Sequence, residues 1–322
     1  MGTTWSQFFP PKPTLTEANL PSQKGKVFIV TGGYSGVGFE LCKILYQAGG
    51  KVYLAGRSEE KALQAIADIK NASPNSEGEI VFLALKLDNL TTIKPAVEKY
   101  ISAESRLDVL FNNAGVSNPP RGSVSSQGHE LQLATNCLGH HLLTQLLLPT
   151  LKQTAHNESP ASVRVIWLSS IVVDTTSAKG VNLEELLGKN TGMNRNYENT
   201  KIGNWFLAND LANQAGSDGI LSVTVNPGNL KSNLTRHFPS WVPYLVAPLL
   251  YHPIMGAYSE LWAAFSPDLT ISDGGKYIVP WGRVHPQPRE GLLQAMKSKE
   301  EGGTGNAALF IQYCHDQIAE FK

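Results

Sequence analysis

The sequence has 322 residues, of which 42% are hydrophobic and 17% charged, a composition typical of a globular enzyme with a sizeable core. Lysine plus arginine balances aspartate plus glutamate at 27 each, which argues against a nucleic-acid or acidic-membrane partner. The three cysteines, Cys42, Cys137 and Cys314, are far apart and form no C-x-x-C pair. This pattern excludes a disulfide framework or a zinc knuckle and favours a reducing compartment.

The first 24 residues are proline-rich and lack the basic and apolar regions of a secretory signal, so we expect an N-terminal leader and a cytoplasmic protein. Apolar runs stay shorter than the roughly 18 residues that a membrane-spanning helix needs, so we expect no transmembrane segment. The adjacent His140 and His141 would diverge by about 100° on a helix and could not chelate one metal ion together. We therefore expect no metal site.

From residue 26 onward, short β-branched runs alternate with longer segments of helical character. The run 26–33, KVFIVTGG, is short and rich in β-branched residues, and it predicts a strand buried on both faces. Further strands are predicted at 51–57, 79–88, 107–115, 162–170 and 221–228, and helices at 36–48, 58–72, 91–104, 128–151 and around 197–201. Such alternation predicts an α/β fold with a Rossmann-type, doubly wound parallel sheet and right-handed crossovers, formed by residues 25–235 as a single domain.

Beyond Gly228 the regular alternation fades. Residues 236–322 are expected to complete the same domain with a C-terminal helical substrate lid, and 272–282 could supply one last strand. The stretch 238–265 is rich in aromatic residues and proline, and it leaves three interpretations open: core packing, a hydrophobic substrate lid, or a patch that touches a membrane. The lid would be formed by Phe238, Trp241, Tyr244, Leu245, Leu249, Leu250 and Tyr251.

A glycine-rich loop, TGGYSGVG (31–38), lies between the first predicted strand and the first long helix. Glycines let the backbone turn tightly and approach a pyrophosphate, whose negative charge is favoured at a helix N-terminus. Glycine patterns alone are weak evidence, but this position between strand and helix is the context that the chemistry requires. The expected cofactor contacts here are Gly32, Ser35, Gly36, Val37 and Gly38.

The residue after the second strand selects between the two nicotinamide cofactors. An acid at this position would bind the ribose hydroxyls of NAD, but the chain has Arg57 there. An arginine presents a planar fork that suits a 2′-phosphate, which favours NADP(H), and Lys61 one turn later could assist. The alternative is that Arg57 forms a surface ion pair with Glu59 or Glu60.

Tyr197 and Lys201 lie four residues apart in a predicted helix, so their side chains share one face. A phenol and an ammonium in one cleft could serve proton transfer, because a nearby positive charge favours the phenolate. The same spacing is common on solvated helix surfaces. The pair alone does not decide between these two interpretations.

Six segments occur in the order that the short-chain dehydrogenase/reductase family shows: TGGYSGVG, NNAG (112–115), ATNCLG with Asn136, LSS (168–170), YENTK (197–201) and NPGNLKS (226–232). The chain therefore resembles this family over residues 25–235. More narrowly, it is similar to the retinol-dehydrogenase and WW-domain-oxidoreductase-like branch, and to its fungal members in particular. The features behind this narrower likeness are Arg57, the NPGNL loop and the long segment between Ser170 and Tyr197.

The resemblance implies a four-residue catalytic set. Tyr197 would be the general acid or base, and Lys201 would lower the pKa of Tyr197 while holding the nicotinamide ribose. Ser170, the second serine of its pair, would donate a hydrogen bond to the substrate oxygen. Asn136 would distort its helix and hold a water molecule that links Lys201 to solvent.

The resemblance also implies further cofactor contacts. Asp88, after the third strand, would lie at the adenine, and Asn113 would lie close to the cofactor in the next strand-end loop. Leu230 and Ser232 match the loop that covers the nicotinamide amide. Tyr197 and Lys201 would themselves touch the cofactor.

The implied activity is that of an NADP(H)-dependent oxidoreductase, which interconverts a hydrophobic ketone or aldehyde and its alcohol by hydride transfer, with secondary metabolism as the setting for a fungal member. Two alternatives stay open: an NAD-linked alcohol dehydrogenase working in the oxidising direction, and a non-catalytic nucleotide-sensing protein on the same fold. The expected partner is a small hydrophobic carbonyl or alcohol. A homodimer is also open, although the apolar tail could block the helices through which related enzymes pair.

Two departures from the family pattern concern the substrate side. A long insertion separates Ser170 from Tyr197, and we expect it to shape the substrate entrance. Tyr34, inside the glycine loop, is bulkier than the residue expected there. It would either lean over the cofactor or close part of the cleft.

Overall fold

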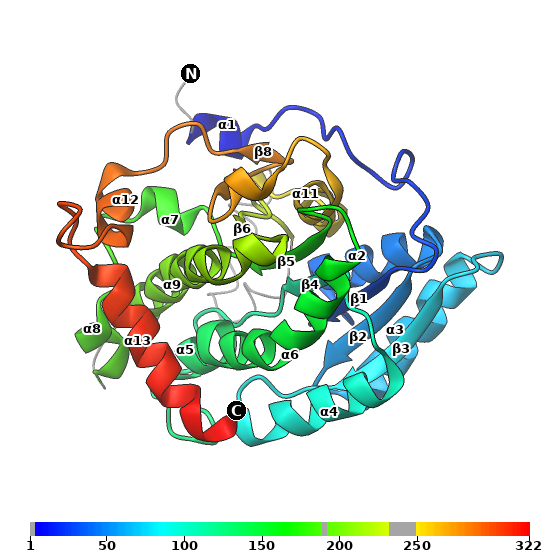
Figure 1. The fold of residues 1–322 in the computed structure, drawn as a ribbon, viewed down its shortest axis with the longest axis horizontal. Helices are drawn as coiled ribbons and strands as arrows, with labels where there is room; N and C mark the ends of the chain where they lie inside the picture. The colour runs from blue at the N-terminus through cyan, green and yellow to red at the C-terminus, as the bar shows by residue number, and fades with distance from the viewer. Residues whose placement is uncertain (1–3, 189–191, 232–248) are drawn as a thin grey trace.

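The computed structural model describes residues 4–188, 192–231 and 249–322, and one sheet runs through its centre (Figure 1). The described chain contains an eight-stranded sheet in the order β3-β2-β1-β4-β5-β6-β7-β8. All neighbours pair in parallel except β8, which runs antiparallel to β7 at the edge. The strands are β1 (Val27–Thr31), β2 (Lys51–Gly56), β3 (Glu79–Ala84), β4 (Val109–Asn112), β5 (Val163–Leu168), β6 (Ile220–Val225), β7 (Tyr277–Val279) and β8 (Arg283–Val284).

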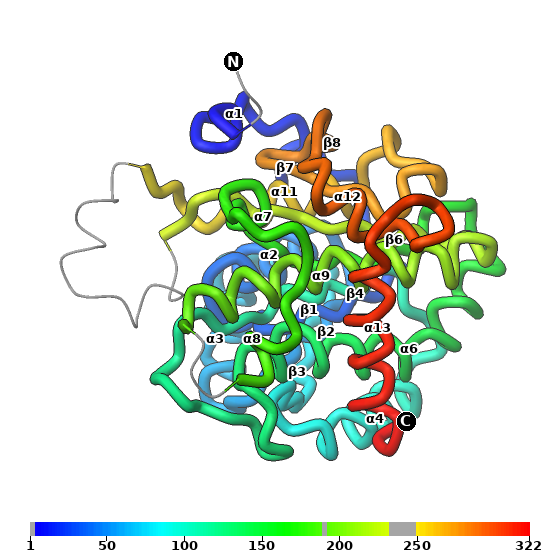
Figure 2. The backbone as a smooth tube through the Cα atoms, turned by 90° about the vertical axis from the view of Figure 1, so that its left-hand side faces the viewer, coloured from blue at the N-terminus to red at the C-terminus, as the bar shows by residue number. Residues whose placement is uncertain are grey.

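Long helices cover both faces of the sheet, as Figures 1 and 2 show, and each buries apolar side chains against it. One face carries α2 (Gly36–Gln47), α3 (Glu59–Ala72) and α11 (Pro253–Phe265), and the other carries α4 (Ile93–Ala103), α6 (Gly139–His156) and α9 (Met193–Ala215). The Rossmann-type, doubly wound parallel sheet predicted from the alternation of segments is therefore confirmed.

Further helices complete the described chain, and none of the helices in it is long and apolar enough to cross a membrane. These α-helices are α1 (Trp5–Phe8), α5 (Leu131–Leu133), α7 (Val172–Thr175), α8 (Leu183–Leu187), α12 (Glu290–Met296) and α13 (Asn306–Ile318). Single helical turns occur at η1 (Leu90–Thr92), η3 (Gly216–Asp218), η6 (Ile271–Asp273) and η7 (Ala319–Phe321).

The third strand is shorter than predicted. Its alternation continues past the strand, because Leu85 and Leu87 are buried like Leu83. Pairing nevertheless stops at Ala84, since the neighbouring strand β2 ends at Gly56. Residues 85–88 therefore continue beyond the carboxyl edge of the sheet.

Part of the aromatic stretch 238–265 belongs to the core. α11 begins at Pro253, a residue that is favoured in the first helical turn because it has no N–H to leave unpaired. Its Leu261 is fully buried in the cluster that also contains residues of α2. Core packing therefore holds for residues 253–265. Four of the predicted lid residues lie outside the described residues: Phe238, Trp241, Tyr244 and Leu245.

The proline-rich segment before β1 is held against the rest of the domain. In α1, Gln7 is fully buried, and the Arg283 guanidinium donates to the carbonyl oxygen of Ser6 at 3.0 Å. Farther along, the Gln23 N–H donates to the carbonyl oxygen of Ala48 at 2.8 Å, just after α2. Figure 1 shows α1 next to β8, at the edge of the sheet.

The C-terminal helix α13 packs across α9 and the beginning of α6. Its Phe310 and Cys314 are fully buried. Gly203 in α9 makes room for this contact, because a Cβ there would lie 2.6 Å from the Phe310 ring. The chain then ends near α4, where the Lys94 ammonium donates to the carbonyl oxygen of Lys322 at 3.1 Å.

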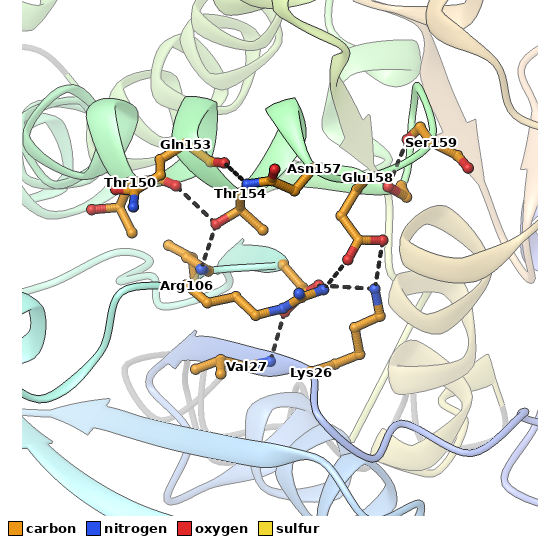
Figure 3. A network of polar contacts seen from close by, with 12 residues as sticks. Lys26, Val27, Arg106, Thr150, Gln153, Thr154, Asn157, Glu158 and Ser159 are labelled. Atoms are coloured by element: carbon orange, nitrogen blue, oxygen red, sulfur yellow. Dashed lines mark hydrogen bonds and ion pairs between the residues drawn. The ribbon is translucent and has the colours of Figure 1, made fainter.

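A polar network joins β1, β4 and the end of α6 at the amino ends of the strands (Figure 3). The buried Asp108 carboxylate accepts from the Val27 N–H at 2.8 Å and from Arg106 Nε at 2.7 Å. Glu158 accepts from Arg106 at 2.5 Å and from Lys26 at 3.0 Å, and these two cations lower the pKa of Glu158. The network fixes the start of both central strands.

We expect Asp108→Ala to reduce the free energy of unfolding by roughly 2–4 kcal/mol, because it leaves the Val27 N–H and part of the Arg106 guanidinium buried without an acceptor. Urea denaturation measures this loss. Glu77→Ala, which breaks the exposed ion pair with Lys24, is the control and should change nothing measurable. A loss of less than about 1 kcal/mol in Asp108→Ala would show that the network is not a stabilising element.

Candidate active site

A cleft of about 880 Å³ opens at the carboxyl ends of the parallel strands. It lies where β1 and β4 are neighbours and the crossovers turn in opposite directions, which is where open α/β sheets bind ligands. Residues at or after the carboxyl ends of β1 to β6, together with residues of α9, line it. Among the predicted site residues, the lining includes Gly32, Ser35, Gly36, Val37, Arg57, Asp88, Asn113, Ser170, Tyr197, Lys201 and Leu230.

The loop between β1 and α2 forms the floor of the cleft. Gly32 and Gly36 have φ values of +68° and +57°, in the region that favours glycine. Gly38 does not line the cleft but lies directly below it, where a Cβ would come within 2.7 Å of the Gly32 carbonyl oxygen and 2.6 Å of Asn113 Nδ2. Asn113 donates from this nitrogen to the Thr31 carbonyl oxygen at 2.7 Å. The amide of Asn113 therefore holds the loop from beneath.

Tyr34 leans toward the end of β2. A Cβ on Gly56 would lie only 2.3 Å from Cε1 of the Tyr34 ring, so the ring packs directly on the glycine backbone. Both residues line the cleft. The bulky residue of the glycine loop thus forms a wall beside the end of β2.

Arg57 and Asp88 face each other at the far end of the cleft. The Arg57 side chain is 59% exposed, and its Nη1 lies 3.7 Å from Oδ2 of Asp88. The structure thus pairs Arg57 with Asp88 and not with Glu59 or Glu60. Exposed pairs at this distance are worth little, so the guanidinium is free to bind an anion. Lys61 is exposed on α3 and does not line the cleft.

Ser170, Tyr197 and Lys201 converge on the cleft from two elements. Ser170 follows β5, whereas Tyr197 and Lys201 project from one face of α9. The Ser170 side chain acts to lower the pKa of Tyr197, which indicates that the two hydroxyl groups lie close together. Lys201 Nζ lies 5.6 Å from the centroid of the Tyr197 ring and donates to the Leu168 carbonyl oxygen at 3.1 Å. A proton donor and a cation therefore share one wall of the cleft.

Burial controls the protonation of both groups on α9. It raises the pKa of Tyr197 to about 12, while the Ser170 side chain acts in the opposite direction. It lowers the pKa of Lys201 to about 8. At pH 7 the phenol is therefore neutral and the amine is mostly protonated. The depression of the Tyr197 pKa expected from Lys201 is thus not the dominant effect in the protein alone.

Asn136 lies behind the cleft in a π-helical segment, Ala134–Leu138, which divides the helix predicted at 128–151. Its Oδ1 accepts from the Val116 N–H at 2.9 Å, and its Nδ2 donates to the Val116 carbonyl at 3.0 Å and to Thr200 at 3.1 Å. A Cβ on Gly115 would lie 3.4 Å from Asn136 Oδ1 and 3.5 Å from Lys201 Nζ. Asn136 thus ties the loop after β4 to α9. Isolated π-helical turns of this kind are frequent at functional sites.

The loop after β6 closes one side of the cleft. Leu230 and Leu250 line it, and the backbone pairs Asn229 with Tyr251 through a hydrogen bond of 2.8 Å. Ser232 lies outside the described residues. Of the predicted lid, the described part therefore contributes Leu250 to the cleft.

Sequence reasoning missed a buried polar contact beneath the glycine loop. Thr31 Oγ1 accepts from the Ala114 N–H at 2.9 Å and lies 2.9 Å from His140 Nε2. His140 Nδ1 lies 3.1 Å from the Asn136 carbonyl oxygen. The spacing of four residues between Asn136 and His140 is the signal that could have indicated that His140 points toward the site, because residues four apart share a helix face.

Known proteins resemble this chain over most of its length. The short chain dehydrogenase family model matches residues 26–243. The short-chain dehydrogenase/reductase bet4 of Neocamarosporium betae is 43% identical over 100% of this chain and 94% of its own length. A short-chain dehydrogenase/reductase of Phomopsis amygdali is 43% identical over 98% of this chain and 96% of its own length. Among solved structures, a Mycobacterium paratuberculosis protein has a TM-score of 0.66 at 25% identity and covers 95% of this chain and 97% of that one.

We expect Gly38→Ala to destabilise the protein by about 1–3 kcal/mol, because the added methyl group meets the Gly32 backbone and the Asn113 amide. Urea denaturation gives the size of the loss. Gly192→Ala is the matched control, since its φ is −68° and a Cβ there would meet nothing within 4 Å. Equal unfolding midpoints for the two variants would contradict the close packing under the loop.

Proposed function

This chain belongs to the short-chain dehydrogenase/reductase family, and we propose that it is an NADP(H)-dependent oxidoreductase that interconverts an apolar ketone or aldehyde and its alcohol. Family membership gives the reaction class, which is oxidoreduction between CH–OH and C=O groups. The single observation that carries the rest of the proposal is the convergence of Ser170, Tyr197 and Lys201 in the cleft. This convergence favours an enzyme over a nucleotide sensor, and Arg57 in place of an acid favours NADP(H) over the NAD-linked alternative.

The β1–α2 loop fits a dinucleotide. Its two left-handed glycines and the absence of space for a Cβ at Gly38 leave backbone N–H groups accessible at the start of α2. Gly32, Ser35, Gly36 and Val37 would hold the pyrophosphate. Bound NADP(H) would supply the hydride, and the proton and the orientation of the substrate fall to side chains of the protein.

The rest of the cofactor contacts follow from the lining of the cleft. Arg57 would bind the 2′-phosphate, because its guanidinium is exposed and only loosely paired with Asp88. Asp88 would lie at the adenine. Asn113 and Leu230 line the cleft closer to Tyr197 and would contact the nicotinamide half.

In the reducing direction, Tyr197 would donate its proton to the substrate oxygen. A phenol with a pKa of about 12 is fully protonated at neutral pH, so the donor is ready. The Lys201 ammonium, 5.6 Å from the ring, would stabilise the phenolate that remains. Ser170, which lines the same cleft as the phenol, would orient the substrate oxygen. Asn136, which donates to Thr200, would hold in place the part of α9 that carries Lys201.

The substrate side of the cleft is mainly apolar, which supports an apolar carbonyl compound. Outside the expected cofactor contacts, the lining includes the apolar residues Pro119, Pro120, Leu131, Val172 and Leu250 beside the polar Asn118, Asn194 and Glu198. Such a site gains affinity mainly by removing apolar area from water. The fungal relatives support a role in secondary metabolism, which we include in the proposal.

We expect NADPH to be preferred over NADH by at least tenfold in kcat/KM, or about 1.4 kcal/mol, and Arg57→Asp to reverse the preference. Steady-state kinetics with both cofactors measure the ratio. Lys70→Asp, the same charge change on an exposed residue at the other end of α3, should leave the ratio unaltered. Equal use of both cofactors by the natural protein would show that Arg57 does not recognise a phosphate.

We expect Tyr197→Phe to lower kcat by about 10²–10⁴, because it removes the proton donor and keeps the ring. The Kd for NADPH, measured by fluorescence titration, should stay close to that of the natural protein. Tyr313→Phe is the control, since burial also raises the pKa of Tyr313 to about 12, but the residue lies on α13 outside the cleft. A folded Tyr197→Phe variant with near-normal turnover would contradict the assignment of Tyr197 as the proton donor.

A further inference from the structure

The N-terminal helix α1 places one glutamine side chain inside the domain. Gln7 has no exposed surface, although α1 itself lies at the edge of the molecule (Figure 2). Its Nε2 donates to Asp174 Oδ2 at 2.7 Å, and its Oε1 accepts from Asn226 Nδ2 at 2.7 Å. These partners are 167 and 219 positions away in the sequence. Gln7 thus bridges two segments that lie far apart in the sequence.

The hydrogen bonds at Gln7 have a fixed direction. Asp174 also accepts from His285 Nε2 at 3.0 Å, because His285 Nδ1 accepts from the Gln287 N–H at 3.2 Å and leaves the proton on Nε2. A carboxylate can only accept, so Gln7 must donate to Asp174 and accept from Asn226. Only a neutral amide of this length satisfies both partners.

Both partners of Gln7 lie beside walls of the cleft, close in sequence to residues that line it. Asn226 follows β6 and precedes Pro227 in the lining, and its Oδ1 accepts from the Gly228 N–H at 3.0 Å, in the loop that continues to Leu230. Asp174 lies in α7, which directly follows Ser170 and contributes Val172 to the cleft. One wall would carry the nicotinamide half of the cofactor and the other would carry Ser170.

We propose that Gln7 is a positioning residue, which sets the distance between the cofactor loop after Asn226 and the substrate wall after Ser170. The inference rests on the proposed function, and it makes α1 part of the active site without any contact to substrate or cofactor. Hydride transfer depends steeply on the geometry of the reacting groups, so a bridge between the two walls affects turnover more than binding.

Other polar contacts around α1 surround this bridge but do not replace it. The Tyr251 hydroxyl donates to the Phe8 carbonyl oxygen at 3.1 Å, and the Arg283 guanidinium donates to the Ser6 carbonyl. The Tyr277 hydroxyl donates to the Ser170 carbonyl oxygen at 2.7 Å. These bonds hold the backbone of α1 and of the Ser170 segment, whereas Gln7 is the residue that, within the described ranges, joins Asp174 to Asn226 through side chains.

Gln7→Met tests the bridge, because it keeps the length of the side chain and removes both hydrogen bonds. We expect kcat to fall at least about tenfold, with the Kd for NADPH changed by less than about threefold. Gln64→Met, on the exposed side of α3, is the matched control and should behave like the natural protein. Rates are measured well below the unfolding midpoint of each variant, so that lost stability is not counted as lost activity. Natural kcat in a folded Gln7→Met variant would overturn the proposal.

A charge exchange gives a second test. Gln7→Glu places two carboxyl groups in contact, so activity should persist at low pH, where they share a proton, and fall as pH rises through the raised pKa of the pair. His285, which donates to Asp174 from Nε2, and Arg283, which donates to the Ser6 carbonyl oxygen, lie near this pair. In the double variant Gln7→Glu, Asp174→Asn, the amide at position 174 donates to the carboxylate at position 7, which still accepts from Asn226. This variant should restore kcat without that pH dependence. Failure of the double variant to recover kcat would contradict the proposed bridge.

Hydrogen exchange separates this inference from the proposed function. In Gln7→Met, amides of both residues 168–176 and residues 226–231 should exchange faster, while those of β1 and β4 should not. If the natural protein reduced no carbonyl compound, the proposed function would fail, and the exchange data would still decide whether Gln7 joins the two walls. Unchanged exchange in either segment would reject the bridge.

Discussion

The cleft is a consequence of one topological constraint: the winding of the chain reverses between β1 and β4. Right-handed crossovers place successive helices on opposite sides of this point, so no connection covers the carboxyl ends of these two strands. The loop after β1 borders the crevice and must come close to whatever binds there. The space beneath that loop is filled by Asn113, which leaves none for a side chain at Gly38. Strand order thus creates the site, and backbone packing shapes its floor.

Burial of α9 against β5 and β6 sets the protonation states of Tyr197 and Lys201, which line the cleft from this helix. Removal from water disfavours the charged form of each group, which raises the pKa of Tyr197 to about 12 and lowers that of Lys201 to about 8. The protein alone therefore presents a protonated phenol, which is the state that the proposed carbonyl reduction requires. Asn136 contributes indirectly, because its side chain joins the loop after β4 to Thr200 on the same helix. The Gln7 bridge adds a constraint from outside the sheet.

The features of the fold and the site that depend on local sequence patterns could be predicted. The features that depend on long-range contacts could not. Alternating strands and helices and the glycine loop depend on neighbouring residues, so the sequence alone indicates them. The length of the third strand depends on where its partner β2 ends, and the alternation through Leu87 conceals that end. The protonation of Tyr197 depends on how deeply α9 is buried, which no spacing reveals. Gln7 stands in a segment that looked like a leader, and its partners are 167 and 219 residues away. Only the folded chain brings them together.

The central claim is that this cleft transfers hydride from NADPH to an apolar carbonyl compound with a proton from Tyr197. The most direct measurement uses NADPH with both hydrogens at nicotinamide C4 replaced by deuterium, incubated with the protein and a panel of apolar ketones and aldehydes, with mass spectrometry of the products. The account predicts an alcohol with one deuterium on the carbinol carbon, formed by the natural protein and not by Tyr197→Phe. Tight NADPH binding without deuterium transfer to any carbonyl carbon would contradict it.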